Sequence, residues 1–360
     1  MEWNVNYLIP GLRLASNVYF PNAKSELLFE EGCILTKEMI SKLKRRKIAI
    51  VSVEIDETIN HYDDELFCQT CELFRTCDIS NILKMIRKYV DIATNSDNLI
   101  FDIRKYFTGE NDFFSHMTNM LVMSIALAKW HNQSSSKNQR IPLDKVAQLA
   151  AFKDIGWIAK SDNIRGLLKD KYALIIESLR KRFPEIPLSI LDDYIEEYRH
   201  VYSYLIYREF ISDSQVEEAI LYSKMPNSSE DEQIRAMCNV VKLVDVYDAL
   251  LIHNIKEEPE NPLASIQRKL ESLISQGILD AYWTKLLKAA LPLFPRLSKV
   301  LLSDNTIALV SEINIEDMLK PKLIDLQGRE ILLNKENATI IRPYLSSLGV
   351  DAVNNRHKSI

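Results

Sequence analysis

The feature that most constrains the fold of this chain is a pattern of apolar residues three and four apart, which continues from about residue 80 to residue 293. The segments "ISNILKMIRKYVDIA", "FFSHMTNMLVMSIALAKW" and "EQIRAMCNVVKLVDVYDALLIH" show it clearly. This spacing places apolar side chains on one face of an α-helix, which can then be buried against neighbouring helices. The chain of 360 residues also contains only 8 glycines, too few for the turns of a strand-rich fold. The sequence therefore predicts a mostly α fold around a helical bundle.

Both ends of the chain depart from this pattern. Near the start, "VYFPNAKSELLFEEGCILT" has short apolar runs broken by turn residues, and "IAIVSVEI" is typical of a buried strand. Near the end, apolar and polar residues alternate around Asp304-Asn305 and again around Gln327-Gly328, which predicts two hairpins. We expect a small α+β domain over 1–60, a connector over 61–79, the helical domain over 80–293, a short β segment over 294–345 and a C-terminal tail over 346–360.

Composition and charge exclude several classes of protein. Hydrophobic residues make up 47% and charged residues 26% of the chain, a mixture typical of a folded protein. The net charge of −5 gives no basic excess, so we expect no DNA partner. No apolar run approaches the roughly 20 residues of a membrane helix, and "MEWNVNYLIPGLRLAS" does not read as a signal peptide. The five cysteines, an odd number, suggest free thiols and a cytoplasmic location.

Four candidate site residues follow one another along the helical region: His116, Asp154, His200 and Asp245. Each has an ordinary structural explanation when it is considered alone. A single histidine in a helix is more often a hydrogen-bonded core residue than a ligand. Asp245 and Asp248, three apart on one helix face, could be a solvated pair. The order of the residues and their local sequences make a functional interpretation stronger.

The segments "AAFKDIGWIAK" and "LVDVYDALL" resemble two motifs of the HD superfamily of metal-dependent phosphohydrolases, and the second is closest to its HD-GYP branch. "SHMTNMLVMSIALA" is similar to the histidine-bearing helix of that branch, and both flanking regions are similar to its usual flanks. The resemblance implies a helical domain that holds Fe, Mn or similar ions and hydrolyses cyclic di-GMP. It also implies that His116, Asp154 and Asp245 are metal ligands and that His200 serves a second ion.

Several residues differ from those the resemblance leads us to expect. Lys153 occupies the place of the motif histidine, and a protonated lysine has no lone pair for a metal. Trp157 occupies the place of a lysine that helps hold phosphate, and the segment around Tyr222 lacks two expected histidines. Two aspartates facing each other without a metal would repel, and an ammonium between them would neutralise the site. We therefore predict that Lys153 contacts Asp245 or another acidic residue in place of an ion; the alternative is that Lys153 points to solvent.

These departures lead to three hypotheses of function. The leading one is a catalytically degenerate HD-GYP-like protein, a regulatory or binding module of bacterial cyclic-di-GMP-type signalling with protein partners. In it, Asp154 is a remnant of the catalytic pair, and Trp157 and Lys153 are candidate ligand-binding residues, with a base stacking on the indole. The second is a metal-dependent phosphodiesterase with a reduced ligand set, and the third is a purely structural interaction domain. We expect no cofactor or a divalent metal (Fe, Mn or Zn) at partial occupancy, and we retain a cyclic dinucleotide and a homodimer as alternatives.

A second candidate site lies in the predicted connector, where "FCQTCELFRTC" contains Cys68, Cys71 and Cys77. A Cys-x2-Cys pair is half of a typical zinc or iron–sulfur site. A second matched pair is missing from the sequence, so free or partly buried thiols are the alternative.

Overall fold

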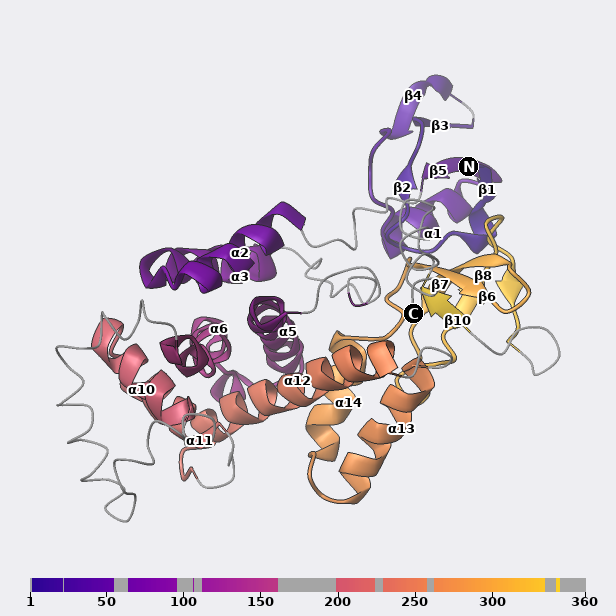
Figure 1. Ribbon diagram of the computed structural model, residues 1–360. Helices are drawn as coiled ribbons and strands as arrows, with labels where there is room; N and C mark the ends of the chain where they lie inside the picture. Colours follow the sequence, from indigo (N-terminus) through magenta and orange to yellow (C-terminus); the bar gives the residue numbers. More distant parts are fainter. Residues whose placement is uncertain are drawn as a thin grey trace, which may run out of the picture.

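The computed structural model describes residues 2–21, 23–54, 64–95, 106, 112–160, 199–223, 229–257, 262–333 and 341–343, and the statements below concern these residues. The fold is mostly helical, as predicted, with strands near both ends of the chain (Figure 1). None of the helices in the described ranges has both the length and the apolar character needed to span a membrane.

The helical part is arranged around α5 (Phe113–Ser134), which is buried on all sides for most of its length. A helix with buried residues around its whole circumference lies in the centre of a bundle. It packs against α2, α3, α6, α12 and α14. The bounds of the surrounding helices are α2 Asp64–Thr76, α3 Ile79–Asn95, α6 Leu143–Phe152, α10 Arg199–Phe210, α11 Ser214–Tyr222, α12 Glu232–Glu257, α13 Pro262–Ser275 and α14 Ala281–Ala290.

The N-terminal unit consists of strands with one helix. Strands β1 (Glu2–Asn4), β5 (Ile50–Glu54) and β2 (Arg13–Leu14) form an antiparallel sheet in the order β1-β5-β2. A separate hairpin contains β3 (Val18–Phe20) and β4 (Ala23–Phe29). Helix α1 (Lys37–Arg45) begins after Thr36, whose hydroxyl accepts a hydrogen bond from the Met39 N–H and so caps the helix.

The C-terminal unit is a five-stranded antiparallel sheet in the order β10-β6-β7-β8-β9. Its strands are β6 Lys299–Leu302, β7 Ile307–Glu312, β8 Lys322–Ile324, β9 Glu330–Ile331 and β10 Ile341–Pro343. Both predicted hairpins are present: Asn305, with φ 65°, lies between β6 and β7, and Gly328, with φ 84°, lies between β8 and β9. Residues 346–360, the predicted tail, lie outside the described residues.

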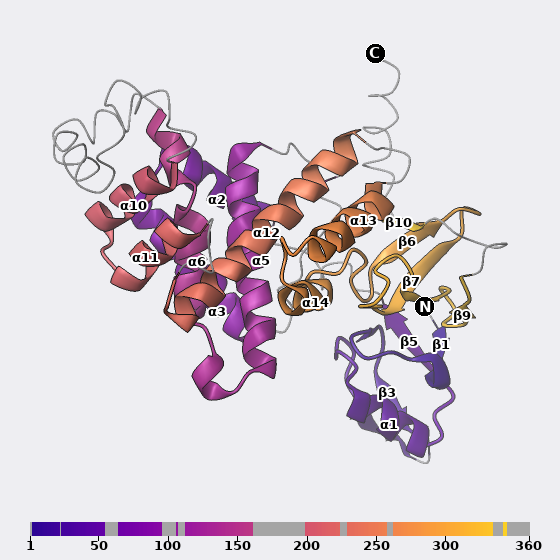
Figure 2. The same ribbon diagram turned by 90° about the horizontal axis from the view of Figure 1, so that it is seen from below.

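The structure differs from the expected domain organisation in two features. Most of the predicted connector is helix α2, and its residues Leu66 and Phe74 are buried in the main helical core. The two terminal units also share one core, because Leu297, Leu309 and Ile324 of the C-terminal part pack into the N-terminal cluster. Figures 1 and 2 show the N-terminal unit beside the C-terminal sheet from two directions.

A substitution at Gly11 tests the contact between the terminal units. Gly11 has φ +98°, and a Cβ there would approach Leu297 Cδ1 to 2.8 Å. Because left-handed backbone strain adds to this overlap, Gly11→Ala is expected to lower the free energy of unfolding by about 2–3 kcal/mol in urea titrations. Gly32→Ala is the control, since Gly32 has φ +82° with nothing within 4 Å, and about 1–2 kcal/mol is expected. Equal losses of unfolding free energy at the two glycines would contradict the packing argument. So would a Gly11→Ala variant that costs as much in a Leu297→Ala background as in the wild type.

Candidate functional site

Three helices bring a cluster of charged residues together next to the core. His116 lies in the first turn of α5, Lys153 and Asp154 lie at the C-terminal end of α6, and Asp245 and Asp248 lie three residues apart on α12. Helices α5, α6 and α12 pack against one another, so residues far apart in the sequence become neighbours. We call these five residues the Lys153 cluster.

Lys153 binds the two carboxylates that flank it. Its Nζ donates hydrogen bonds to Asp154 Oδ2 and to Asp245 Oδ2, the latter at 3.1 Å. The side chains of Lys153 and Asp154 are only 6% and 7% exposed, and that of Asp245 is 35% exposed. The predicted contact between Lys153 and Asp245 is thus present, and the alternative that Lys153 points to solvent is wrong.

The electrostatic environment keeps Lys153 charged. Burial by itself lowers the pKa of an amine, because an ammonium loses solvation. The Asp154 and Asp245 carboxylates outweigh burial and raise the pKa of Lys153 above its ordinary value. Lys153 therefore carries its positive charge at neutral pH, between the two aspartates.

His116 lies against the same carboxylates. Its Nε2 is 3.7 Å from Asp154 Oδ2 and 3.6 Å from Asp245 Oδ1, while its Nδ1 is 2.6 Å from Asp248 Oδ2. Burial opposes protonation most strongly, but the interactions with Asp154 and Asp248 outweigh it and raise the pKa of His116 to about 9. The ring is therefore an imidazolium at neutral pH, with a proton on each nitrogen.

Asp248 is the most enclosed member of the cluster and has no exposed surface. Besides His116, its carboxylate accepts hydrogen bonds from the Tyr106 hydroxyl and from Asn119 Nδ2, the latter at 3.1 Å. Sequence reasoning noted Asp248 only as a neighbour of Asp245 and did not identify Tyr106 or Asn119. Helical spacing could have suggested Asn119, three residues after His116, whereas no local pattern indicates Tyr106.

Aromatic residues lie beside the cluster. Trp157, in the short 3-10 helix Ile155–Lys160, is partly buried, and its ring centroid is 6.1 Å from that of Phe113. The Phe113 ring is in turn 6.4 Å from the His116 ring. A hydrogen bond to α10 holds this segment, since Gly156 N–H donates to the Ser203 side-chain Oγ at 2.9 Å. The indole expected to bind a ligand base therefore packs on a phenylalanine next to His116.

Two remaining expectations concern His200 and a ligand contact of Lys153. His200 lies in α10, but its side chain lies outside the described residues. Lys153, also considered as a ligand-binding residue, already donates to two carboxylates and is buried. Two of its three N–H donors are thus engaged within the protein.

The three cysteines of the second candidate site lie in different environments. Cys68 is exposed on α2, whereas Cys71 is buried there and its sulfur is 3.3 Å from Thr118 Oγ1. Cys77 follows the helix in a left-handed conformation with φ 51°. Burial raises the pKa of Cys71 and brings that of Cys77 to about 11, so neither thiol is activated as a nucleophile at neutral pH. Within the described ranges the three sulfurs do not come together as a group that could hold one ion, which favours the alternative of free thiols.

The cluster offers a partial ligand set for a metal. In the described ranges, the only group of three or more ligand-type side chains close enough to hold one ion consists of His116, Asp154 and Asp245, whose ligand atoms lie within 4.8 Å of one another. One imidazole and two carboxylates would suit Fe or Mn. However, Lys153 Nζ donates hydrogen bonds to both of these carboxylates. As arranged, these residues do not fit a divalent cation.

The arrangement can neutralise buried acids and hold three helices together, and no residue in it provides an activated nucleophile. No protein-family model, curated protein or solved structure matches this chain.

Proposed function

We propose that this chain is a catalytically degenerate HD-GYP-like protein that acts by binding, as a regulatory module in bacterial cyclic-di-GMP-type signalling. The observation that carries the proposal is the position of Lys153 Nζ, which donates to both Asp154 and Asp245. These are two of the residues that the resemblance assigns to a metal. An ammonium supplies positive charge at the same place, so the carboxylates remain paired without an ion.

The presence of Lys153 in place of the motif histidine also removes the chemistry of hydrolysis. Metal-dependent phosphodiester hydrolysis uses an ion to polarise the phosphate and to lower the pKa of a bound water. An ammonium has no open coordination position and no lone pair, so it does neither. His116, protonated on both nitrogens, also cannot accept a proton from water. In this proposal the helical domain acts by binding and does not hydrolyse a phosphodiester.

One observation favours a second candidate, a metal-dependent phosphohydrolase with a reduced ligand set. The ligand atoms of His116, Asp154 and Asp245 lie within 4.8 Å of one another. For an ion to bind there, the Lys153 ammonium would have to leave both carboxylates. The two candidates therefore differ in whether metal or lysine holds the aspartates together.

Elemental analysis of protein purified without chelator separates the candidates. We expect the wild type to hold far less than one equivalent of Fe, Mn or Zn and to leave cyclic di-GMP intact in the presence of Mn²⁺. Lys153→His removes the ammonium and supplies a lone pair, so metal content should rise toward one equivalent and fall again in Lys153→His/Asp154→Ala. Stoichiometric metal in the wild type that disappears in Asp154→Ala, together with turnover, would establish the phosphohydrolase instead.

A further inference from the structure

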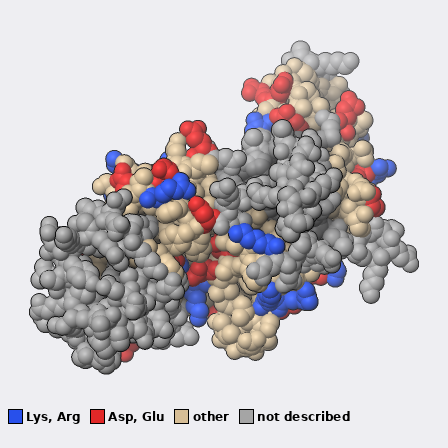
Figure 3. All heavy atoms as spheres, in the orientation of Figure 1, with Lys and Arg blue, Asp and Glu red and all other residues tan. Residues whose placement is uncertain are grey.

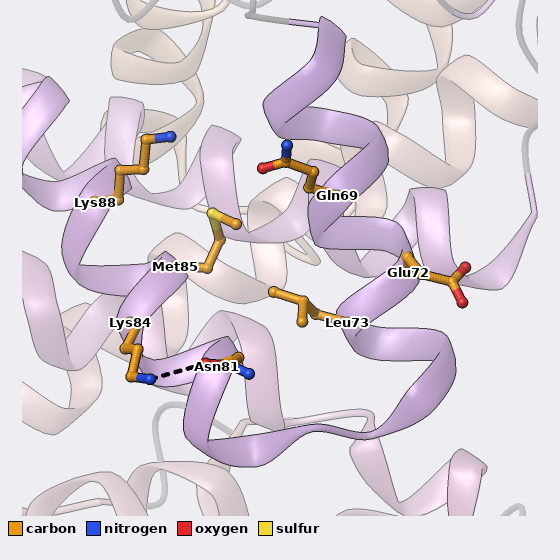
Figure 4. A pocket seen from close by; sticks show the side chains of 7 residues that line it. All are labelled: Gln69, Glu72, Leu73, Asn81, Lys84, Met85 and Lys88. Atoms are coloured by element: carbon orange, nitrogen blue, oxygen red, sulfur yellow. Dashed lines mark hydrogen bonds between the residues drawn. The ribbon is translucent and has the colours of Figure 1, made fainter.

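A groove runs along the outer side of the hairpin formed by α2 and α3. It has a volume of about 450 Å³ and is lined by Leu73 and Met85 together with Gln69, Glu72, Lys84 and Lys88 (Figure 4). The opposite side of the hairpin is already packed, since α2 and α3 contact α5, and α3 also contacts α6. The groove is thus separate from the Lys153 cluster and faces solvent.

The rim of the groove has an excess of positive charge. Charged side chains gather over α2 and α3 on the face seen in Figure 3. Glu72 is paired with Arg75, whose Nη1 is 2.6 Å from Glu72 Oε2 and whose Nη2 is 3.2 Å from Asp112 Oδ2. Lys84 donates only to the neutral Asn81 amide, at 3.0 Å, and Lys88 has no ion-pair partner among the described residues. Two lysine charges therefore remain available on the α3 side.

The spacing of these lysines matches an α-helix. Lys84 and Lys88 are four residues apart on α3, which puts them one turn, or about 6 Å, apart along the helix. Acidic residues at i and i+4 of a second helix lying alongside would face both ammonium groups. Between α2 and α3, the partly buried Leu73 and Met85 form an apolar floor, and the unbranched Met side chain adapts to different apolar partners.

We infer that this groove binds an amphipathic α-helix of a partner protein, with apolar side chains on Leu73 and Met85 and acidic side chains toward Lys84 and Lys88. The hairpin presents two adjacent helices, and a third helix in the groove between them completes a three-helix packing unit. The inference deepens the proposed function, on which it rests, by giving the class of partner that a binding module of this kind recognises.

The test uses the full chain and a synthetic helical peptide of about five turns, or roughly 18 residues. The peptide carries Leu along one stripe and Glu on both flanks, with a fluorescent label for anisotropy. The wild type should bind it in low salt, and Lys84→Glu/Lys88→Glu should weaken binding by about tenfold. A peptide with Lys in place of each Glu should restore binding to that double variant. Arg87→Glu is the matched control, because Arg87 is exposed on the same helix but does not line the groove.

Three results would overturn the inference: no binding of the Glu peptide to the wild type, equal binding of the Glu and Lys peptides, or an effect of Arg87→Glu as large as that of Lys84→Glu/Lys88→Glu. The last would mean that the overall charge of α3, and not the groove, attracts the peptide. Metal content and turnover do not enter this measurement. Failure of peptide binding therefore removes the groove alone, whereas stoichiometric metal and turnover in the wild type remove the proposed function alone.

Discussion

Lys153→Met is expected to lower the free energy of unfolding by about 3 kcal/mol, because the buried Asp154 carboxylate loses its hydrogen-bonded ammonium and keeps the His116 ring at 3.7 Å. Asp154 bears most of this cost, since its side chain is 7% exposed whereas that of Asp245 is 35% exposed. Methionine keeps most of the volume of lysine, so the loss is due to charge and not to a cavity. The measurement is urea or thermal unfolding at neutral pH, and the loss is a large part of the total stability of a typical domain.

The matched control is Lys145→Met. Lys145 Nζ is 3.1 Å from Asp213 Oδ2, but these side chains are 26% and 34% exposed, so the loss should stay below about 1 kcal/mol. Adding Asp154→Asn to Lys153→Met should recover part of the lost stability, because it removes the buried carboxylate charge that has lost its ammonium. If both lysine variants lose the same stability, or if Asp154→Asn brings no recovery, Lys153 does not neutralise a buried charge.

Asp248→Ala is expected to cost about 3–5 kcal/mol, because it removes the common acceptor of three polar side chains. Asn119 and Tyr106 are 5% and 3% exposed, and Asp248 itself is 0% exposed, so little water can replace the lost carboxylate. His116 also loses the partner at its Nδ1. Unfolding in urea measures the loss. Asp248→Asn should cost less, since it keeps the volume and one acceptor oxygen.

Asp280→Ala serves as the control for Asp248→Ala. Asp280 caps α14, where its Oδ1 accepts a hydrogen bond from the Trp283 N–H at 3.1 Å, and removing such a cap costs about 1 kcal/mol. If Asp248→Ala loses no more unfolding free energy than Asp280→Ala, the buried hydrogen bonds of Asp248 contribute little to stability. A loss in Asp248→Asn as large as in Asp248→Ala would show that the charge, and not the volume, stabilises the cluster.

Local patterns predicted much of the fold correctly. The three-and-four spacing predicted the mostly helical fold, and Asp304-Asn305 and Gln327-Gly328 predicted two hairpin turns. The same spacing was present in α2 at Leu66 and Phe74, but the charges and the three cysteines of this region led us to expect a connector. The mistake came from giving composition more weight than periodicity over a short segment.

For the candidate site too, some features followed from the sequence and others only from the tertiary structure. The amino-acid sequence by itself determined that Lys153 has no lone pair for a metal and that an ammonium next to Asp154 could replace one, because these are properties of the side chains. Only the tertiary structure decided that Asp248 collects hydrogen bonds from Tyr106 and Asn119, and that Leu297 packs into the N-terminal core. The apolar periodicity of a segment indicates which of its faces is buried. The packing of all segments together determines which of these faces contact one another. The local sequence around residues more than a hundred positions apart does not show that they are in contact.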